Sequence, residues 1–160
     1  MDETHQRIIL PELNPEDEEI RVSNEEFHYL KNVLRLRPAQ RVIVLDGRGL
    51  ELQTIIKEVK KKTLTLKVLK RKKHAPPRRG RLILIQAVLK ADRMDLVVQK
   101  TTELGVDVIV PVFTENTVLK NTKKLQHWRR VCLEATRQSR RLFMPEIKEP
   151  CPLRKALQEA

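Results

Sequence analysis

Residues 134–141, with the sequence EATRQSRR, gather an amide, hydroxyl groups and guanidinium groups in one short segment. Gln138 and Ser139 are able to hydrogen-bond to the edge of a base, and Arg141 is able to bind a phosphate group through two parallel N–H donors. The same arginines are also what a helix C-terminus carries to complement the helix dipole. The residue types alone leave both interpretations open.

A strand-helix-strand unit that would position such groups is predicted over residues 82–112. Residues 82–88 (LILIQAV) are an apolar run typical of a buried parallel strand, and Asp92 followed by Asp95 indicates the start of a helix. Gly105 ends that helix, and residues 106–112 (VDVIVPV) are a second apolar run. Such crossovers are almost always right-handed, and ligands bind beyond the carboxyl ends of the strands.

A long helix is predicted over residues 123–140. Its buried face has Leu125, Trp128, Cys132 and Ala135, and a separate basic stripe at steps of seven and four has Arg130, Arg137 and Arg141. An extended segment follows at residues 145–147, and Pro152 begins a terminal helix with Leu153, Ala156 and Leu157. A parallel sheet with so few strands leaves an edge and part of a face uncovered, so we expect Ala160 to be an internal position of a longer domain.

Residues 1–72 are predicted to form a small β-rich unit with one helix. Ser23 and Glu26 make a capping box at the start of a helix near residues 24–35. The apolar side of that helix has Phe27, Leu30, Val33 and Leu34, and its polar side has His28, Asn32 and Arg35. Residues 41–45 and 50–56 flank a turn at residues 46–49 and predict a β-hairpin, and a further strand covers residues 63–69. Short strands with one helix favour a small barrel.

Positive charge is distributed unevenly along the chain. The formal net charge is +12, yet residues 1–26 hold nine acidic and two basic side chains, whereas residues 27–81 hold three acidic and 17 basic ones. A polyanionic partner is the simplest physical reason for such self-repulsion, because each Lys or Arg that neutralises a phosphate releases a counterion. A solvated basic surface is the alternative. The basic, proline-containing residues 73–81 are predicted to be a linker, either solvated or in contact with RNA phosphates.

The composition disfavours several classes of protein. The two cysteines, Cys132 and Cys151, and the four histidines lack metal-ligand or catalytic-triad spacing, so we expect no metal and no disulfide framework. We expect a cytoplasmic protein without membrane contact, since no apolar run approaches the roughly 20 residues of a membrane span and the acidic N-terminus is no signal peptide. Five aromatic residues are too few for a base-stacking sheet, and the four glycines include no phosphate-binding loop.

Short motifs spread along the chain, in the same order, resemble one family of RNA-modifying enzymes. The matching residues are Arg7 to Leu10, residues 28–35 (HYLKNVLR), Asp46-Gly47, residues 90–95 (KADRMD), residues 99–106 (QKTTELGV), Thr114-Glu115, and Glu134-Ala135 with Gln138, Ser139 and Arg141. The chain resembles the N-terminal two thirds of the bacterial 16S ribosomal RNA uridine-N3 methyltransferase family, the RsmE-type members of the SPOUT superfamily. Each motif is weak by itself, and together they are highly specific.

This resemblance implies an α/β fold with a small β-barrel. Its parts would be an N-terminal PUA-like RNA-binding barrel over residues 1–72, the linker over residues 73–81, and the first part of a SPOUT (trefoil-knot type) α/β methyltransferase domain over residues 82–160. The cofactor would be S-adenosyl-L-methionine, the partner 16S ribosomal RNA or the small ribosomal subunit, and the assembly a homodimer. The family's glycine-rich GPEGG stretch and its later LGRILR segment have no counterpart here. We therefore expect cofactor-binding residues beyond Ala160, an incomplete knot, and an inactive 160-residue chain.

The resemblance also implies site residues. We expect Arg141, Gln138 and Glu103 nearest the reaction, with Glu103 serving either the chemistry or only as an ion-pair partner that orients an arginine. The RNA-binding residues would be Arg7, His28, Asn32, Arg35, Lys90, Arg93 and Ser139. The chain departs from the family at Ala39 (usually a turn glycine), Asn116 (usually arginine), and Arg137 and Arg140 (usually an acid or a small residue). A noncatalytic RNA-binding module and a ribosome-associated protein without a cofactor site are the alternative functions.

Overall fold

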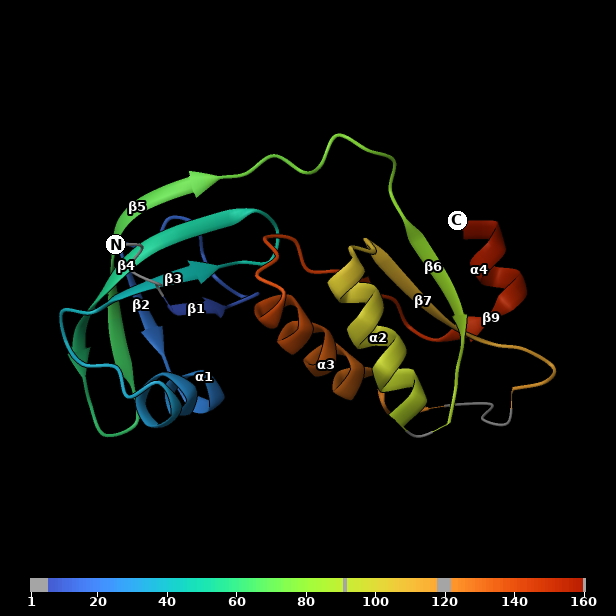
Figure 1. The fold of residues 1–160 in the computed structure, drawn as a ribbon, viewed down its shortest axis with the longest axis horizontal. Helices are drawn as coiled ribbons and strands as arrows, with labels where there is room; N and C mark the ends of the chain where they lie inside the picture. The colour runs from blue at the N-terminus through green and yellow to red at the C-terminus, as the bar shows by residue number, and fades with distance from the viewer. Residues whose placement is uncertain (1–5, 91, 118–121, 160) are drawn as a thin grey trace. The chain divides into compact units, whose positions relative to one another are not determined.

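A computed structural model describes residues 6–90, 92–117 and 122–159 of the chain. The chain divides into two compact units, residues 1–76 and 77–160, and each unit has its own hydrophobic core (Figure 1). No helix in the described part of the chain has the length and apolar character of a membrane span. The same described residues hold no group of three His, Cys, Asp or Glu side chains arranged for a metal ion.

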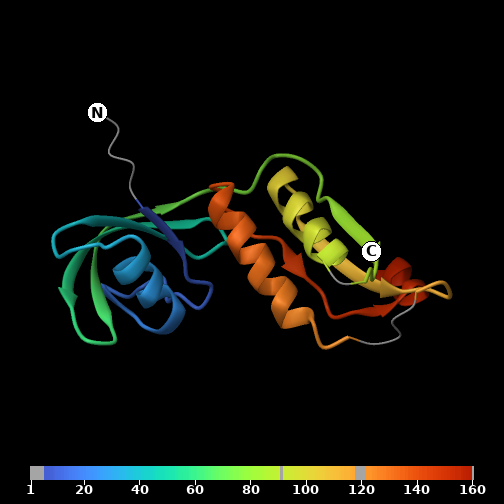
Figure 2. The same cartoon turned by 60° about the horizontal axis from the view of Figure 1, so that its bottom comes forward.

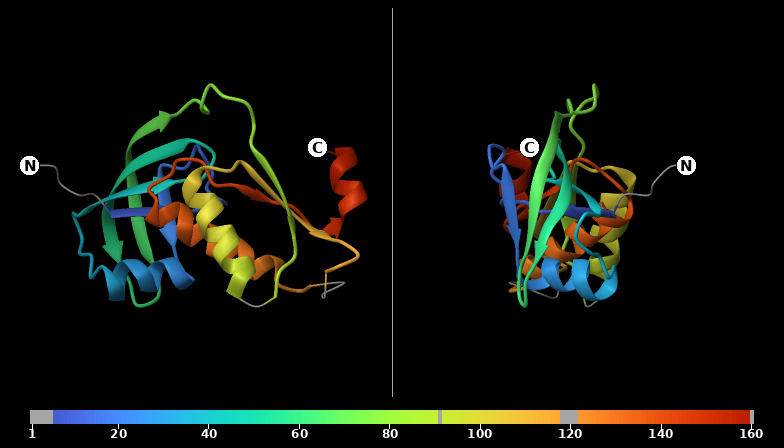
Figure 3. Two further views of the ribbon diagram at one scale, coloured as in Figure 1. Left: turned by 45° about the vertical axis from the view of Figure 1, so that its right-hand side comes forward. Right: turned by 90° about the vertical axis from the view of Figure 1, so that its left-hand side faces the viewer.

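The first unit is a curled five-stranded sheet with one helical segment (Figure 3). Its elements are β1 (Gln6–Ile9), β2 (Glu19–Val22), α1 (Asn24–His28), the π-helical turn η1 (Tyr29–Val33), β3 (Arg41–Leu45), β4 (Leu50–Val59) and β5 (Leu64–Lys73). The strand order is β1-β3-β4-β5-β2, with β1 and β3 parallel and the other neighbours antiparallel. Because β1 and β2 lie at the two edges, the predicted small barrel is an open curled sheet. Strand and turn signals specify neighbouring pairs but not closure between the first and last strands.

The predicted helix near residues 24–35 is present, but its second half is wound differently. Ser23 is the N-cap, but its side chain makes no capping hydrogen bond, and Asn24 has a positive φ of 55°, so the part of the predicted capping box that Ser23 would supply is absent. The backbone N–H of Leu34 donates to the carbonyl oxygen of Tyr29, five residues back, at 3.0 Å. This wider π turn changes the direction in which the following side chains point. Val33 is therefore 66% exposed, although it was predicted on the apolar side of the helix. Phe27 and Leu30 are buried as predicted.

The predicted β-hairpin is confirmed in β3 and β4. The carboxylate of Asp46 accepts hydrogen bonds from the backbone N–H groups of Arg48 (2.7 Å) and Leu50 (2.9 Å), while Gly47 (φ 71°) supplies the left-handed backbone of the turn. The next strand, β5, extends beyond the predicted residues 63–69 as far as Lys73. Its basic end pairs with β4 through the backbone, so exposed lysines do not interrupt it.

The second unit is a parallel sheet with helices on both faces. Its elements are β6 (Ile83–Ala87), α2 (Asp92–Leu104), β7 (Val108–Phe113), α3 (Leu125–Gln138), β8 (Glu146–Ile147), β9 (Cys151–Pro152) and α4 (Leu153–Glu159). The order is β6-β7-β8, and β9 also pairs with β7, all in parallel register. Helices α2 and α3 lie side by side on one face, away from α4 (Figures 1 and 2). The predicted strand-helix-strand unit over residues 82–112 is confirmed.

The predicted buried face of the long helix is also confirmed. Leu125, Trp128, Cys132 and Ala135 of α3 are all at most 8% exposed, and the first three share a core cluster with Met94 and Val98 of α2 and with residues of the sheet. Burial raises the pKa of the Cys132 thiol, so this cysteine stays protonated and acts as a small apolar core residue. In α4 only part of the predicted apolar side is covered, since Ala156 is buried while Leu157 is 63% exposed.

Candidate functional site

The parallel strands have their carboxyl ends on one side of the sheet, here called the carboxyl edge, and their amino ends on the other side, here called the amino edge. These two sides collect different candidate residues. Helix α2 begins beyond the carboxyl end of β6 and ends beside the amino end of β7, and α3 returns in the same direction. Lys90 and Arg93 therefore lie at the carboxyl edge, where ligands of parallel sheets usually bind. Glu103 and Arg141 lie at the opposite, amino edge. The residues expected nearest the reaction are thus not at the carboxyl edge of this unit, because both helices that carry them end at the amino edge.

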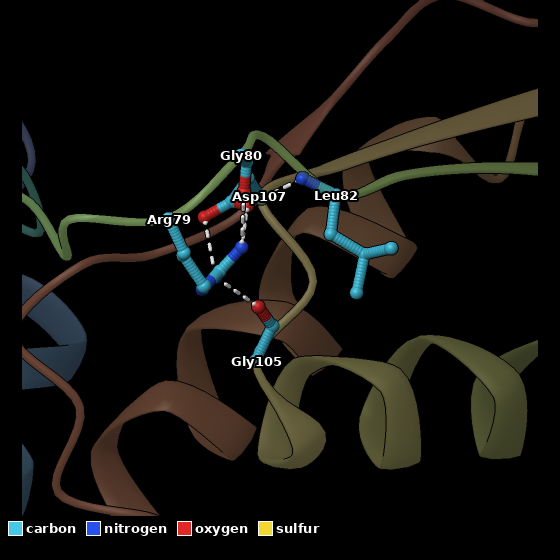
Figure 4. A network of polar contacts seen from close by, with 5 residues as sticks. All are labelled: Arg79, Gly80, Leu82, Gly105 and Asp107. Atoms are coloured by element: carbon cyan, nitrogen blue, oxygen red, sulfur yellow. Dashed lines mark hydrogen bonds and ion pairs between the residues drawn. The ribbon is translucent and has the colours of Figure 1, made fainter.

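An ion-pair network holds the amino edge together (Figure 4). The guanidinium of Arg79 donates to both carboxylate oxygens of Asp107, at 2.6 and 3.0 Å, and to the carbonyl oxygen of Gly105 at 2.8 Å. The carboxylate of Asp107 also accepts the backbone N–H of Leu82 at 2.7 Å. Arg79 was predicted in a linker, either solvated or on RNA phosphates, whereas the structure gives its guanidinium four acceptor atoms within this unit, because it also donates to the carbonyl oxygen of Gly80 at 2.9 Å.

The electrostatics of Asp107 follow from these contacts. The hydrogen bond from Arg79 lowers the pKa of the Asp107 carboxyl, the backbone hydrogen bond from Leu82 acts in the same direction, and the charge of Arg141 adds to the effect. Desolvation opposes these contributions without cancelling them. Asp107 is therefore a stable anion that fixes the linker and the start of β6.

Arg141 owes its position to the way α3 ends. The backbone N–H of Arg141 donates to the carbonyl oxygen of Thr136 at 3.1 Å, while Arg140 takes a left-handed φ of 55°. This reversal is the geometry of a Schellman-type helix end, with an arginine in place of the usual glycine. The predicted stripe of Arg130, Arg137 and Arg141 is therefore wrong at Arg141, because the helix stops before the stripe reaches it.

The side chain of Arg141 instead lies against Gly105. A Cβ atom added to Gly105 would come within 2.7 Å of Nη1 of Arg141, so the absence of a side chain there makes room for the guanidinium. Gly105 also has a φ of 103°, which suits glycine and ends α2 as predicted. Two arginines, Arg79 and Arg141, thus approach the same glycine.

The other predicted members of this site have local partners. Glu103 binds Lys100 at 2.9 Å and Gln99 at 3.1 Å, both on its own helix, and the Lys100 hydrogen bond lowers the pKa of Glu103. Its cation partner is a lysine rather than the arginine expected, and the lowered pKa makes the carboxylate a weaker base. Ser139 uses its hydroxyl to donate to the carbonyl oxygen of Ala135 at 2.6 Å, whereas Gln138 is exposed.

The candidate residues at the carboxyl edge are less constrained. Lys90 and Arg93 are both exposed, around the start of α2. In the loop after β7, the hydroxyl of Thr117 accepts the backbone N–H of Thr114 at 2.7 Å, and this bond closes the turn that contains the exposed Asn116.

The RNA-binding candidates of the first unit lie on two separate elements. The ring nitrogen Nδ1 of His28 and the amide nitrogen of Asn32 are 3.0 Å apart, so the predicted polar face brings these two side chains together. Arg35 is exposed and follows the helix with a φ of 51°, outside the helical face on which it was predicted. Arg7 lies apart from this group, on β1 opposite Ile43.

Asp107 is the residue of this site that sequence reasoning missed. An acid immediately before an apolar strand, and close to the glycine that ends a helix, was the available signal. Its partner Arg79 is 28 positions away, a separation that helix and strand periodicities do not address.

Comparison with known proteins agrees with this architecture. The model of the RNA methyltransferase domain matches residues 76–160, and that of the RNA methyltransferase PUA domain matches residues 22–69. The ribosomal RNA small subunit methyltransferase E of Buchnera aphidicola (subsp. Schizaphis graminum) is 29% identical over 136 residues, which cover 82% of this chain and 55% of that protein. That of Synechocystis is 30% identical over 132 residues, which cover 82% and 43%. The chain therefore spans about half the length of these relatives.

Two solved structures share the fold over nearly the whole chain. A ribosomal RNA small subunit methyltransferase E from Neisseria gonorrhoeae, bound to S-adenosyl methionine, has a TM-score of 0.85 and 26% identity, and the match covers 98% of this chain and 66% of that one. A Legionella pneumophila protein in complex with the same cofactor has a TM-score of 0.87 and 28% identity, with the same coverage. The chain thus combines a PUA domain with a methyltransferase domain, and it belongs to the RNA methyltransferase family, with the ribosomal RNA small subunit methyltransferases E among its relatives.

Proposed function

We propose that this protein transfers the methyl group of S-adenosyl-L-methionine to N3 of a uridine in 16S ribosomal RNA. The observation that carries the proposal is the match of 98% of the chain to the cofactor-bound Neisseria methyltransferase at a TM-score of 0.85. The first unit, matched by the PUA domain model, would bind RNA, and the basic character of residues 27–81 supports a polyanionic partner. A knot of the SPOUT type, a homodimer and a cytoplasmic location belong to the same proposal.

The cofactor assigned by this proposal supplies an electrophilic methyl group, and the described groups of the amino edge do not by themselves form a site for it. Its sulfonium is positively charged, whereas the amino edge presents the guanidinium groups of Arg79, Arg81 and Arg141. A second cavity of about 340 Å³ beside α4 is lined by apolar residues, which include Ile83 and Val110, and by side chains of both charges. Nothing in that cavity selects a sulfonium or an adenine, so we assign no cofactor-binding residue within the described part of the chain.

The reaction also requires groups that act on the uridine of the RNA. The N3 proton of uridine is weakly acidic, so a base must remove it or a cation must stabilise the anion that forms. Arg141 is the group we place nearest the reacting uridine, because its guanidinium is held against Gly105 and carries a permanent charge. Gln138 and Glu103 complete the proposed set, with Glu103 in a supporting role, since Lys100 already binds its carboxylate.

The proposal is tested by methyl transfer to small ribosomal subunits that lack the modification. A full-length version of the protein, incubated with labelled S-adenosyl-L-methionine, should label 16S RNA, and nucleoside analysis should identify N3-methyluridine. Methylation of another atom would contradict the assigned position. Tight RNA binding without any methyl transfer would instead favour a noncatalytic RNA-binding module or a ribosome-associated protein.

The 160-residue chain itself provides the matched comparison. We expect it to bind S-adenosyl-L-methionine weakly or not at all and to be inactive, because it matches 66% of the cofactor-bound Neisseria chain and contains no glycine-rich loop. Calorimetric titration of this chain with the cofactor measures the affinity directly. Micromolar binding would show that the cofactor site lies within these residues.

A further inference from the structure

An open groove at the amino edge carries more positive than negative charge. Its volume is about 520 Å³, and its lining includes Arg79, Arg81, Gly105 and Arg141. Asp107 neutralises Arg79, and Glu146 binds Arg81 at 3.2 Å. Three guanidinium groups thus face two carboxylates, and Arg141 is the cation left over.

Arg141 is also the member of the groove whose hydrogen-bonding groups are unused. Among the described residues nothing accepts a hydrogen bond from its guanidinium, and its Nε is fully buried without a partner. Because Nε is out of reach of a ligand, the Nη groups beside Gly105 are the donors open to an incoming acceptor in the groove. The acceptors of the neighbouring network already have donors, because Arg79 binds the carbonyl oxygen of Gly105 and shares the carboxylate of Asp107 with the N–H of Leu82.

We infer that this groove binds a phosphate group of the RNA beside the target uridine, with Arg141 as the donor and with Arg79 and Asp107 as positioning residues. The planar guanidinium fork suits a phosphate oxyanion, and the exposed Arg78 extends the positive surface beside the groove. Because Asp107 binds the guanidinium of Arg79, this guanidinium is not the group that binds the phosphate. The same contact holds the linker in place as one wall of the groove. That the phosphate belongs to RNA rests on the proposed function.

The site is tested by nuclear magnetic resonance on the isotope-labelled 160-residue chain. Titration with inorganic phosphate should shift the Nε–H resonance of Arg141, and a fragment of 16S RNA should shift it at lower concentration. Arg141→Ala should weaken RNA binding about tenfold, the loss of one charge-assisted hydrogen bond, and make the salt dependence shallower by about 0.7 unit. Arg141→Lys, which keeps the charge but not the fork, should give an intermediate loss and guards against misfolding of the alanine variant.

Arg140→Asn is the matched control. It removes a positive charge from the neighbouring residue, and asparagine tolerates the left-handed backbone found there. This variant should leave the phosphate-induced shift of Arg141 unchanged. Equal effects of Arg140→Asn and Arg141→Ala on RNA affinity, or no shift of Arg141 Nε–H with phosphate, would overturn the site. A shift produced by an acidic peptide or by S-adenosyl-L-methionine, but not by phosphate, would also overturn it.

The two proposals fail in different ways. If the full-length protein methylates uridine but phosphate does not shift the Nε–H resonance of Arg141, the proposed function stands and the phosphate site is wrong. If phosphate and RNA shift Arg141 but no uridine is methylated, the groove is an RNA-phosphate site and the methyltransferase activity is wrong.

Discussion

The amino edge of the parallel sheet and the polar face of the α1–η1 segment are both proposed to meet RNA, but they hold their polar groups differently. At the amino edge, Arg79 is fixed by Asp107, and Arg141 is half-buried against Gly105. On the α1–η1 segment, His28 and Asn32 have each other as partners, and Arg35, which follows the segment, is exposed. A fixed guanidinium loses little further freedom on binding and is able to orient a ligand, whereas an exposed one contributes mainly charge.

The largest effect should come from Arg141→Ala in a full-length version of the protein. At saturating RNA, the single-turnover rate of methyl transfer should fall by roughly 100-fold, because a target nucleotide that is displaced by about 1 Å loses that much reactivity. Arg140→Ala should have a small effect, since this exposed residue replaces one that is usually small in the family. Equal, small effects of both changes would show that the helix end is only a charged cap and that the active site lies elsewhere.

Asp107→Asn tests whether the amino edge is built by its ion pair. The free energy of unfolding should fall by about 1 kcal/mol, a value kept low because Arg79 is 40% exposed and solvent screens the pair. The pKa of Asp107 is lower in the folded protein than in the unfolded chain. The stabilisation is therefore complete above the ordinary carboxyl range and is lost as the pH falls toward the folded-state pKa.

Urea unfolding measured from pH 7 down to pH 3 checks this prediction. The difference in stability between the natural protein and Asp107→Asn should shrink as the pH falls. A difference that is constant over this range would mean that the carboxylate charge does not stabilise the fold.

Arg35→Ala addresses the exposed side of the comparison. It should make the salt dependence of RNA affinity shallower by about one unit and leave the melting temperature almost unchanged, because Arg35 is exposed. Filter binding of 16S RNA at several salt concentrations, with a thermal melt of the same samples, measures both quantities. Loss of the folded first unit with an unaltered salt slope would make Arg35 structural.

The smallest effect is expected from Ala39→Gly. Ala39 has a φ of 69°, a left-handed conformation that costs an alanine about 1 kcal/mol, and it stands where the family usually has a turn glycine. The change should stabilise the first unit by about 0.5–1 kcal/mol without altering RNA affinity. Chemical denaturation followed by circular dichroism would detect it, and a destabilised variant would mean that the turn tolerates alanine without strain.

Periodic patterns predicted the fold better than they predicted the site. The apolar runs of β6 and β7 and the buried face of α3 follow directly from local spacing, and they are confirmed. Val33 and Arg141 were misplaced because each prediction continued a regular helix. The chain instead forms a π turn over Tyr29–Val33, and Arg140 takes a left-handed conformation that ends the helix before Arg141. The Arg79–Asp107 pair depends on the tertiary fold, so no local pattern contained it.

The contacts of Arg79 with Asp107 and Gly105 also determine where the methyltransferase unit can be separated from the rest of the chain. A truncation that begins at residue 82, where the first strand of the sheet is predicted, would discard Arg79 and leave the carboxylate of Asp107 without its cation. The carboxylate of Asp107 would then keep only the hydrogen bond from the backbone N–H of Leu82, and Leu82 would be part of a frayed N-terminus. A fragment that starts at or before Pro77 keeps both partners, so the segment that looks like a tether in the sequence is the first piece of the unit it precedes.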